Sequence, residues 1–260
     1  MVDINPVSIS LASYNLTRPE KIIWQFPAGV APLEQIKSSS LKKFLTRAEE
    51  HLHENQINWS LEPLSVDSYS HWLTYYRSKM FESGFRIMAD ETWYDQKIAL
   101  GCQVLGLMFY RAGELVASGI ISLDPKTKTG SLHFKASNKL DLSGRSNSSI
   151  GAVVDYFFLR YAFDQKLATV TSGRSRNAFG IFNTLGYLDF KLKFGYLPTS
   201  DTTSPTTLEV PTLPNKTVAF FGLKERELKL YHYCQTSPAP DLHQLLSLNQ
   251  AVTDLSSLNC

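Results

Sequence analysis

Three apolar runs in the middle of the chain constrain the fold most strongly, because each is separated from the next by a short turn. The runs cover residues 103–111, 115–123 and 130–136, with Ala112-Gly113 and Asp124-Pro125-Lys126 between them. Glycine and proline between apolar runs of strand length are typical of hairpin turns. The sequence therefore predicts an antiparallel meander of three strands.

The segments before the meander alternate between strand and helix patterns. Three serines precede an apolar stripe of helical spacing, which predicts a capped amphipathic helix over 41–52. Gly101 is expected to end the last helix before the meander. The expected strands are 7–11, 22–26 and 57–64, and the expected helices are 41–52, 65–80 and 90–100.

The segments after the meander predict a core helix followed by shorter elements. A broad apolar stripe over residues 150–167 predicts a helix packed against the core. Residues 199–215, rich in Thr, Ser and Pro, are expected to form a loop. The remaining expected elements are strands at 168–172, within 187–196 and at 217–223, a short helix at 177–185 and a solvated charged segment at 224–229.

Composition sets the broad class of the protein. The 260 residues are 43% apolar, enough for a full core in one large or two small domains. Lys and Arg number 26 against 24 Asp and Glu, a formal net charge of +2, so overall charge provides no strong attraction to nucleic acid. The three cysteines lack metal-ligand spacing, and neither a signal peptide nor a membrane span is expected. We expect a cytoplasmic protein with no membrane partner and no metal.

A small polar turn opens the helix expected at residues 150–167. Backbone N–H groups at a helix N-terminus lack partners within the helix and can bind an anion. The turn therefore predicts a cradle for the pyrophosphate of a donor, beside two strands that separate to leave a slot for the donor's arm. The residues expected to form the cradle are Arg145, Asn147, Ser148, Ser149, Ile150 and Gly151.

Two short motifs carry a resemblance to a known family. Gly173-Arg174-Ser175, followed by Phe190-Lys191-x-x-Phe194-Gly195-x-x-Pro198, resembles the FemAB-related branch of the GNAT (N-acetyltransferase) superfamily. The order of expected elements over about residues 57–223 is similar to that fold. The resemblance implies an α+β class with a mixed, mostly antiparallel central sheet flanked by helices on both faces. It also implies an extension at 1–55, a GNAT-like domain at 56–223 and a tail at 224–260.

The chain departs from GNAT enzymes that use acetyl-CoA at two places. Their Arg/Gln-x-x-Gly-x-Gly/Ala turn aligns with residues 146–151, which keep only the last glycine. By the same resemblance, Phe182 occupies the position at which those enzymes have the tyrosine that protonates the leaving thiolate. FemAB-related enzymes are similar to this chain in having a degenerate form of the glycine turn, and they take acyl groups from aminoacyl-tRNA.

The resemblance implies an N-acyltransferase that moves an acyl group from acyl-CoA, as co-substrate, to a small amine or amino-acid acceptor by direct attack. An aminoacyl-tRNA-dependent aminoacyltransferase is the alternative, with tRNA as a partner. A non-catalytic GNAT-like binding module is the alternative of another class. The role of residues 1–55 is left open: they form an eroded second lobe, a lid or a dimer surface. The oligomeric state is also left open, between a monomer and a homodimer.

The third meander strand carries the candidate base. Ser131, His133 and Lys135 are expected on one face of this strand, with Leu132 and Phe134 on the other. Histidine titrates near working pH, so His133 is the candidate general base, and an exposed surface histidine is the alternative. Lys135 is expected to bind substrate on the same face.

Further candidates come from the loops and the second helix of the expected domain. Arg174, as a catalytic residue, and Arg176 are expected to grip a carboxylate or phosphate, with a solvated loop as the alternative. An acidic pair beside an aromatic ring would recognise an amine, although helix N-terminal charges explain the same pattern. The residues expected to bind substrate are Asp90, Glu91, Tyr94, Lys135, Arg176 and Lys191, the last of which could instead flank a strand.

Overall fold

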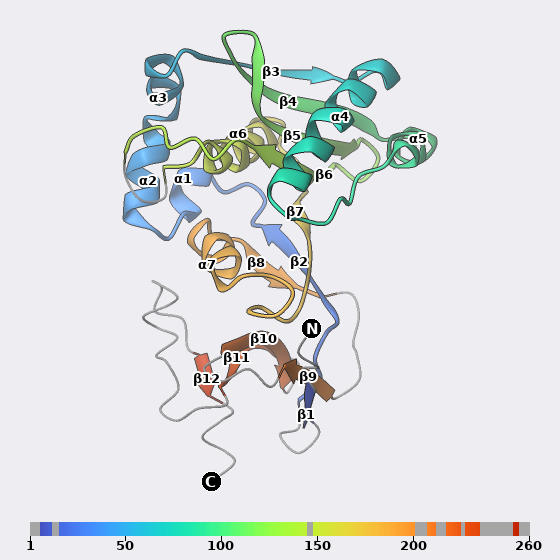
Figure 1. The fold of residues 1–260 in the computed structure, drawn as a ribbon, viewed down its shortest axis with the longest axis vertical. Coiled ribbons are helices and arrows are strands. Elements are labelled where there is room, and N and C mark those ends of the chain that lie inside the picture. The colour runs from blue at the N-terminus through green and yellow to red at the C-terminus, as the bar shows by residue number, and fades with distance from the viewer. Residues whose placement is uncertain are drawn as a thin grey trace. The chain divides into compact units, whose positions relative to one another are not determined.

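The computed structural model describes residues 6–11, 16–144, 148–200, 207–211, 217–224, 227–234 and 252–254 (Figure 1). The chain divides into two compact units. One is residues 25–173, and the other joins residues 1–24 to residues 174–260. The largest sheet has seven strands in the order β3-β4-β5-β6-β7-β2-β8. Its helices and its mostly antiparallel pairing confirm the mixed α+β class.

The unit of residues 25–173 contains the expected meander. The antiparallel strands β3 (Ile57–Pro63), β4 (Gln103–Arg111), β5 (Glu114–Asp124) and β6 (Thr129–Ser137) are joined by β7 (Thr169–Arg176), which runs parallel to β6. Ala112 and Gly113 take positive φ values of 51° and 83° between β4 and β5, which is the tight turn that the sequence predicts.

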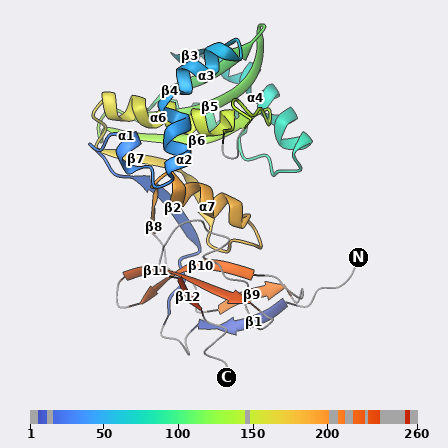
Figure 2. The ribbon, with the colours of Figure 1, turned by 90° about the vertical axis from the view of Figure 1, so that its left-hand side faces the viewer.

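Helices cover both faces of this sheet, as expected (Figures 1 and 2). The helices α4 (Val66–Glu82) and α5 (Glu91–Ala99) lie on one face, and α6 (Ile150–Asp164) lies on the other. Side chains alternate along β4, so that Met108 packs with the α4 side while Phe109 packs edge-on against Phe157 of α6. The centre of the sheet, at β4 and β5, is therefore buried on both faces.

The single helix expected over 41–52 is divided into two helices in the structure. After β2 (Lys21–Phe26) come α1 (Pro32–Gln35), α2 (Ser39–Thr46) and α3 (Ala48–Glu54). Ser38 caps α2, since its hydroxyl accepts a hydrogen bond from the Leu41 N–H at 3.3 Å. Arg47, with φ −107° and ψ 21°, leaves the helical conformation and separates α2 from α3.

The other unit contains the largest departures from expectation. Residues 187–196, expected to contain a strand, instead lie mostly in helix α7 (Leu185–Lys193), which β8 (Leu197–Thr199) follows. The helix expected at 177–185 is a series of turns. The Thr184 hydroxyl accepts a hydrogen bond from the Tyr187 N–H at 3.1 Å, so the helix begins after Thr184.

The same unit contains two small sheets. Strand β1 (Pro6–Ser10) pairs antiparallel with β9 (Thr207–Pro211). Strand β10 (Thr217–Lys224) pairs antiparallel with β11 (Glu227–Cys234), which runs parallel to β12 (Val252–Asp254). The charged segment expected to be a solvated end is thus partly strand.

Candidate active site

Strands β6 and β7 provide the candidate active site at the point where their pairing ends. They pair in parallel over Thr129–Leu132 and Thr169–Ser172, although both strands continue. Beyond these pairs the register of β6 against β5 shifts, which leaves His133 as a bulge, and Gly173 in β7 takes a φ of +72°. Both irregularities turn the strands away from regular pairing beside the N-terminal end of α6.

A buried ion pair lies beside this point. The Lys135 ammonium forms an ion pair with the Asp155 carboxylate and donates to the Gly151 carbonyl at 3.1 Å. The Ser172 hydroxyl donates to the other carboxylate oxygen at 3.3 Å. The Asp155 side chain is fully buried, whereas 30% of the Lys135 side chain is exposed. The cluster is therefore an ion pair whose cation side chain, Lys135, is partly exposed while its carboxylate is buried.

The side of β6 that Lys135 occupies corrects the expected alternation. A residue that bulges from a strand shifts every later side chain to the opposite face. Lys135 and Leu132 consequently lie on the α6 side, while Phe134 packs against Trp93 and Trp72 on the other side. His133 and Lys135 do not share one face.

The N-terminal end of α6 is bonded to the chain itself. The Ile150 N–H donates to the Leu140 carbonyl at 3.1 Å, and the Ala152 N–H donates to the Ser149 hydroxyl at 3.3 Å. The Ser148 carbonyl accepts from the Leu142 N–H at 2.9 Å. Of the expected cradle, Arg145 and Asn147 lie outside the described residues.

A carboxylate lies beside the same end of the helix. Asp141 accepts hydrogen bonds from the Ser143 N–H at 3.1 Å, from the Gly144 N–H at 3.0 Å and from the Ser148 hydroxyl. Asp141 also forms an isolated antiparallel bridge with Ser149, the N-cap of α6. An anionic ligand at this helix end would meet this negative charge at close range.

His133 is held in a largely apolar setting. Its Nε2 lies 2.7 Å from the Ser122 hydroxyl, and its ring packs edge-on against Trp93 at 5.0 Å between centroids. Burial, and secondarily the positive charge of Lys97, lower the pKa of His133 to about 4. The imidazole is therefore neutral at neutral pH, and it holds a proton weakly.

This lowered pKa predicts a loss of stability in acid. Between the folded pKa of about 4 and the unfolded value of 6.5, the unfolded chain binds more protons, so stability falls as pH falls. From pH 7 to pH 5 we expect His133 to account for a loss of about 2 kcal/mol. Urea unfolding of wild type and of His133→Gln at pH 7 and at pH 5 measures this loss of stability. An equal loss in the two proteins would show that His133 is not the group responsible.

The expected acceptor residues have structural partners. Asp90 caps α5 by accepting from the Trp93 N–H at 3.0 Å, and Glu91 forms two hydrogen bonds with Arg77 at 2.7 and 2.9 Å. The buried Tyr94 donates to the Leu64 carbonyl at 2.7 Å. Recognition of an amine by these three residues stays a prediction.

The remaining predicted residues belong to the other unit. Arg174 and Arg176 are exposed at the end of β7, and the Arg176 guanidinium lies 4.5 Å from the centroid of the Phe182 ring. Lys191, on α7, is only 4% exposed, and its ammonium lies 4.4 Å from the centroid of the Tyr196 ring. Lys191 therefore does not flank a strand.

Sequence reasoning missed Asp155, the partner of Lys135, and Ser172, which donates to Asp155. The signal for Asp155 was available, since it is the one charged residue in the apolar run from Ile150 to Leu159. A carboxylate at full burial needs a cation or several hydrogen bonds. Such a residue on the apolar side of a helix therefore predicts a partner on the adjoining strand.

The part of the chain that the structure describes contains neither a metal-binding cluster nor a membrane-spanning helix. No group of three or more His, Cys, Asp or Glu side chains is arranged to hold a metal ion there. None of the helices described has the length and apolar character to cross a membrane.

Comparison with known proteins identifies the fold. No family model and no curated protein sequence matches this chain. Among solved structures, FemX matches with a TM-score of 0.50 at 9% identity, over 75% of this chain and 62% of FemX. A conserved protein of unknown function from Bacteroides thetaiotaomicron matches with a TM-score of 0.46 at 12% identity, over 75% of this chain and 60% of that protein. L-PGS from Bacillus licheniformis matches with a TM-score of 0.43 at 15% identity, over 75% of this chain and 59% of L-PGS.

The likeness to FemX, at 9% identity, concerns the fold alone. This chain spans about three fifths of the length of each of these three solved structures. Over 75% of its length, the chain shares the fold of FemX.

Proposed function

We propose that this protein is an acyltransferase that forms an amide, and that its donor is an aminoacyl ester such as aminoacyl-tRNA. The FemX fold and the Phe190–Pro198 motif support acyl transfer. The observation that supports an ester donor over acyl-CoA is the N-terminal end of α6, which is bonded to the chain itself.

A CoA donor would need a place for its pyrophosphate. Two of the N–H groups that would bind it, those of Ile150 and Ala152, already donate within the chain. The Asp141 carboxylate adds repulsion toward a diphosphate at the same position, which opposes the attraction of the Lys135 ammonium beside Gly151. An aminoacyl ester makes no such demand, because it has no pyrophosphate.

The proposed reaction is direct attack of an amine on the ester carbonyl. A carbon–nitrogen bond forms, the carbon–oxygen bond of the ester breaks, and the proton lost by the amine passes to the leaving oxygen. The tetrahedral intermediate carries a negative charge, which a fixed cation stabilises. Lys135, oriented by Asp155, provides that cation at the point where β6 and β7 separate.

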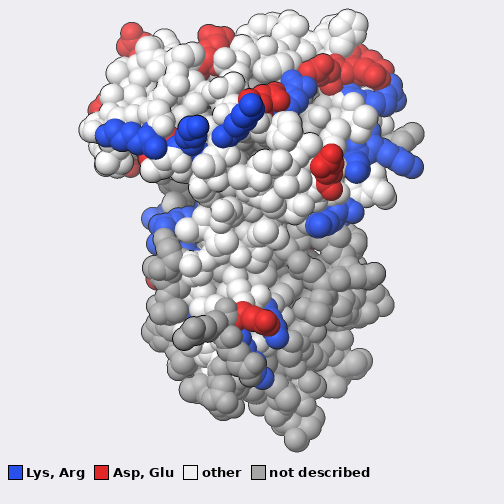
Figure 3. Space-filling view, turned by 180° about the vertical axis from the view of Figure 1, so that it is seen from behind, with Lys and Arg blue, Asp and Glu red and all other residues white. Residues whose placement is uncertain are grey.

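Acyl-CoA stays the second candidate donor because of surface charge. Binding of tRNA needs Lys and Arg along the phosphate backbone. The formal net charge is only +2, and the face in Figure 3 shows basic and acidic side chains interspersed over the described residues. A small donor suits such a surface better than a polynucleotide does.

Binding of each donor discriminates between the two. We expect the melting temperature of the full chain to rise with an amide-linked analogue of an aminoacylated tRNA acceptor stem. This rise should shrink steeply as salt increases, and CoA should cause none. A rise with CoA and none with the analogue would reverse the choice of donor. No rise with either would favour a non-catalytic binding module.

A further inference from the structure

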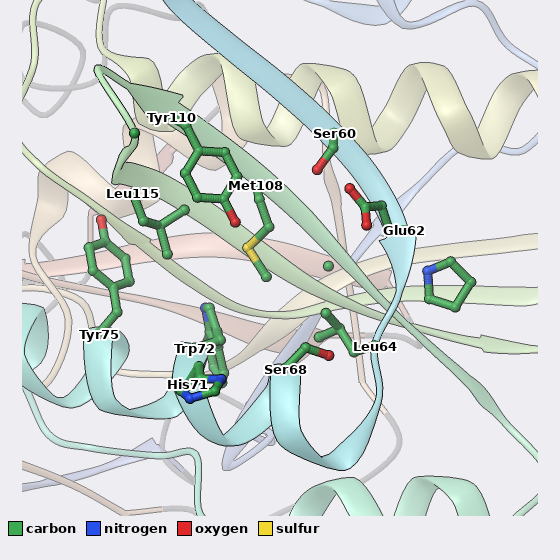
Figure 4. Close-up of a pocket in the computed structure, with 13 residues that line it drawn as sticks. Ser60, Glu62, Leu64, Ser68, His71, Trp72, Tyr75, Met108, Tyr110 and Leu115 are labelled. Carbon is green, nitrogen blue, oxygen red and sulfur yellow. The ribbon is translucent and has the colours of Figure 1, made fainter.

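A cavity of about 440 Å³ lies within the unit of residues 25–173, away from the candidate active site. It lies over β3, β4 and the start of β5, whereas the proposed site lies at β6 and β7. Figure 4 shows that its walls come from β3, from β4 and from α4. Its lining includes Glu62, Leu64, Trp72, Met108, Tyr110 and Leu115.

The register of β3 against β4 places a glycine opposite Glu62. Glu62 pairs with Gly106, so no side chain stands opposite its carboxylate. A Cβ at Gly106 would lie 2.5 Å from the Met108 Cε and 2.7 Å from the Leu64 Cδ2, because these two side chains fold over the glycine. The floor of the cavity is therefore apolar, with a carboxylate at its edge.

The charges of the lining are one-sided. Glu62 is exposed, and it has no ion pair within the described part of the chain. The lining contains no Lys or Arg, so the cavity as a whole favours a positive ligand. Figure 4 shows Glu62 on β3 facing the side of the cavity where Tyr110 and Met108 lie.

Aromatic rings complete the walls. Trp72, Tyr75 and Tyr110 line the cavity, and ring faces attract cations as well as apolar groups. Tyr75 contributes its ring, since its hydroxyl is itself buried.

We propose that this cavity binds an organic cation in which a primary ammonium is attached to an aromatic or branched aliphatic group. Glu62 pairs with the ammonium, and the rings of Trp72 and Tyr110 surround the body of the ligand. Leu64, Met108 and Leu115 supply the apolar contacts. This inference does not depend on the proposed acyl transfer, because its test contains no acyl donor.

Calorimetric titration of the full chain with phenethylammonium tests the proposal, with 2-phenylethanol and phenylacetate as matched probes. We expect saturable binding of phenethylammonium and weaker binding of the other two. Glu62→Gln should lower the affinity for phenethylammonium roughly three- to tenfold, which is the range for an ion pair that is partly shielded from water. Glu62→Lys should reverse the preference in favour of phenylacetate.

Two variants control for indirect effects. Asp95→Asn removes another exposed carboxylate, on α5, and should leave the affinity unchanged. Ser60→Phe fills the cavity from β3 and should abolish binding while the melting temperature stays close to that of wild type. Absence of saturable binding, equal binding of the alcohol and the ammonium, or unchanged affinity in Glu62→Gln would each overturn the proposal.

Discussion

Replacing Lys135 by methionine is expected to lower the free energy of unfolding by about 3–5 kcal/mol, the cost of leaving a buried charge without its partner. The fully buried Asp155 carboxylate would lose the ammonium that neutralises its charge, although the Ser172 hydroxyl would still donate to it. Chemical denaturation measures the loss. Lys139→Met provides the matched control, since Lys139 is exposed and lies on the same segment, and it should change stability by less than about 0.5 kcal/mol.

A double substitution separates stability from function. Lys135→Met combined with Asp155→Asn removes both charges, and we expect it to recover most of the lost stability. If Lys135 also stabilises the transition state, the double variant should fold and still transfer acyl groups at least about 100-fold more slowly than wild type. A folded double variant with wild-type turnover would remove Lys135 from the reaction.

Replacing Asn177 by alanine is expected to destabilise the other unit by about 3–5 kcal/mol, because three backbone groups would lose their partners. The Asn177 side chain donates to the Pro19 carbonyl at 2.8 Å and to the Phe221 carbonyl at 2.6 Å. It also accepts from the Phe221 N–H at 2.7 Å. Asn177 is fully buried, so water cannot replace these bonds in the folded state.

Thermal unfolding of this variant has a matched control in the same segment. Asn183 makes one side-chain hydrogen bond, to the Arg176 carbonyl at 2.8 Å, and this bond is exposed. Asn183→Ala should therefore cost less than about 1 kcal/mol. Equal losses for the two alanine variants would show that the buried bonds of Asn177 do not hold the segment together.

The parts of the fold that local chemistry determines were predictable. Turn residues fixed the meander, and Gly101, with a φ of +76°, ends the region of α5 where expected. The alternation Phe190-Lys191-Leu192-Lys193-Phe194 resembles a strand, yet it is helical because Leu188, Lys191 and Leu192 form a buried stripe. Burial of a lysine is a tertiary effect that the pattern does not reveal.

The candidate site was predictable only in part. Lys135 and the helix opening at Ser149 lie together in the structure, since the Lys135 ammonium bonds the Gly151 carbonyl. The bulge at His133, which separates His133 from Lys135, depends on how β6 pairs with β5, and no residue type marks it. The pairing of Asp141 with the start of α6 likewise depends on contacts across an intervening loop.

The most direct test of acyl transfer is formation of an amide from a labelled donor. The full chain would be incubated with tRNA charged with isotopically labelled amino acids and with a mixture of small amines and amino acids, and the products analysed by mass spectrometry. The account predicts labelled amide with wild type and at least about 100-fold less with the Lys135→Met, Asp155→Asn double variant. Amide from acyl-CoA alone, or equal yields from wild type and the double variant, would contradict it.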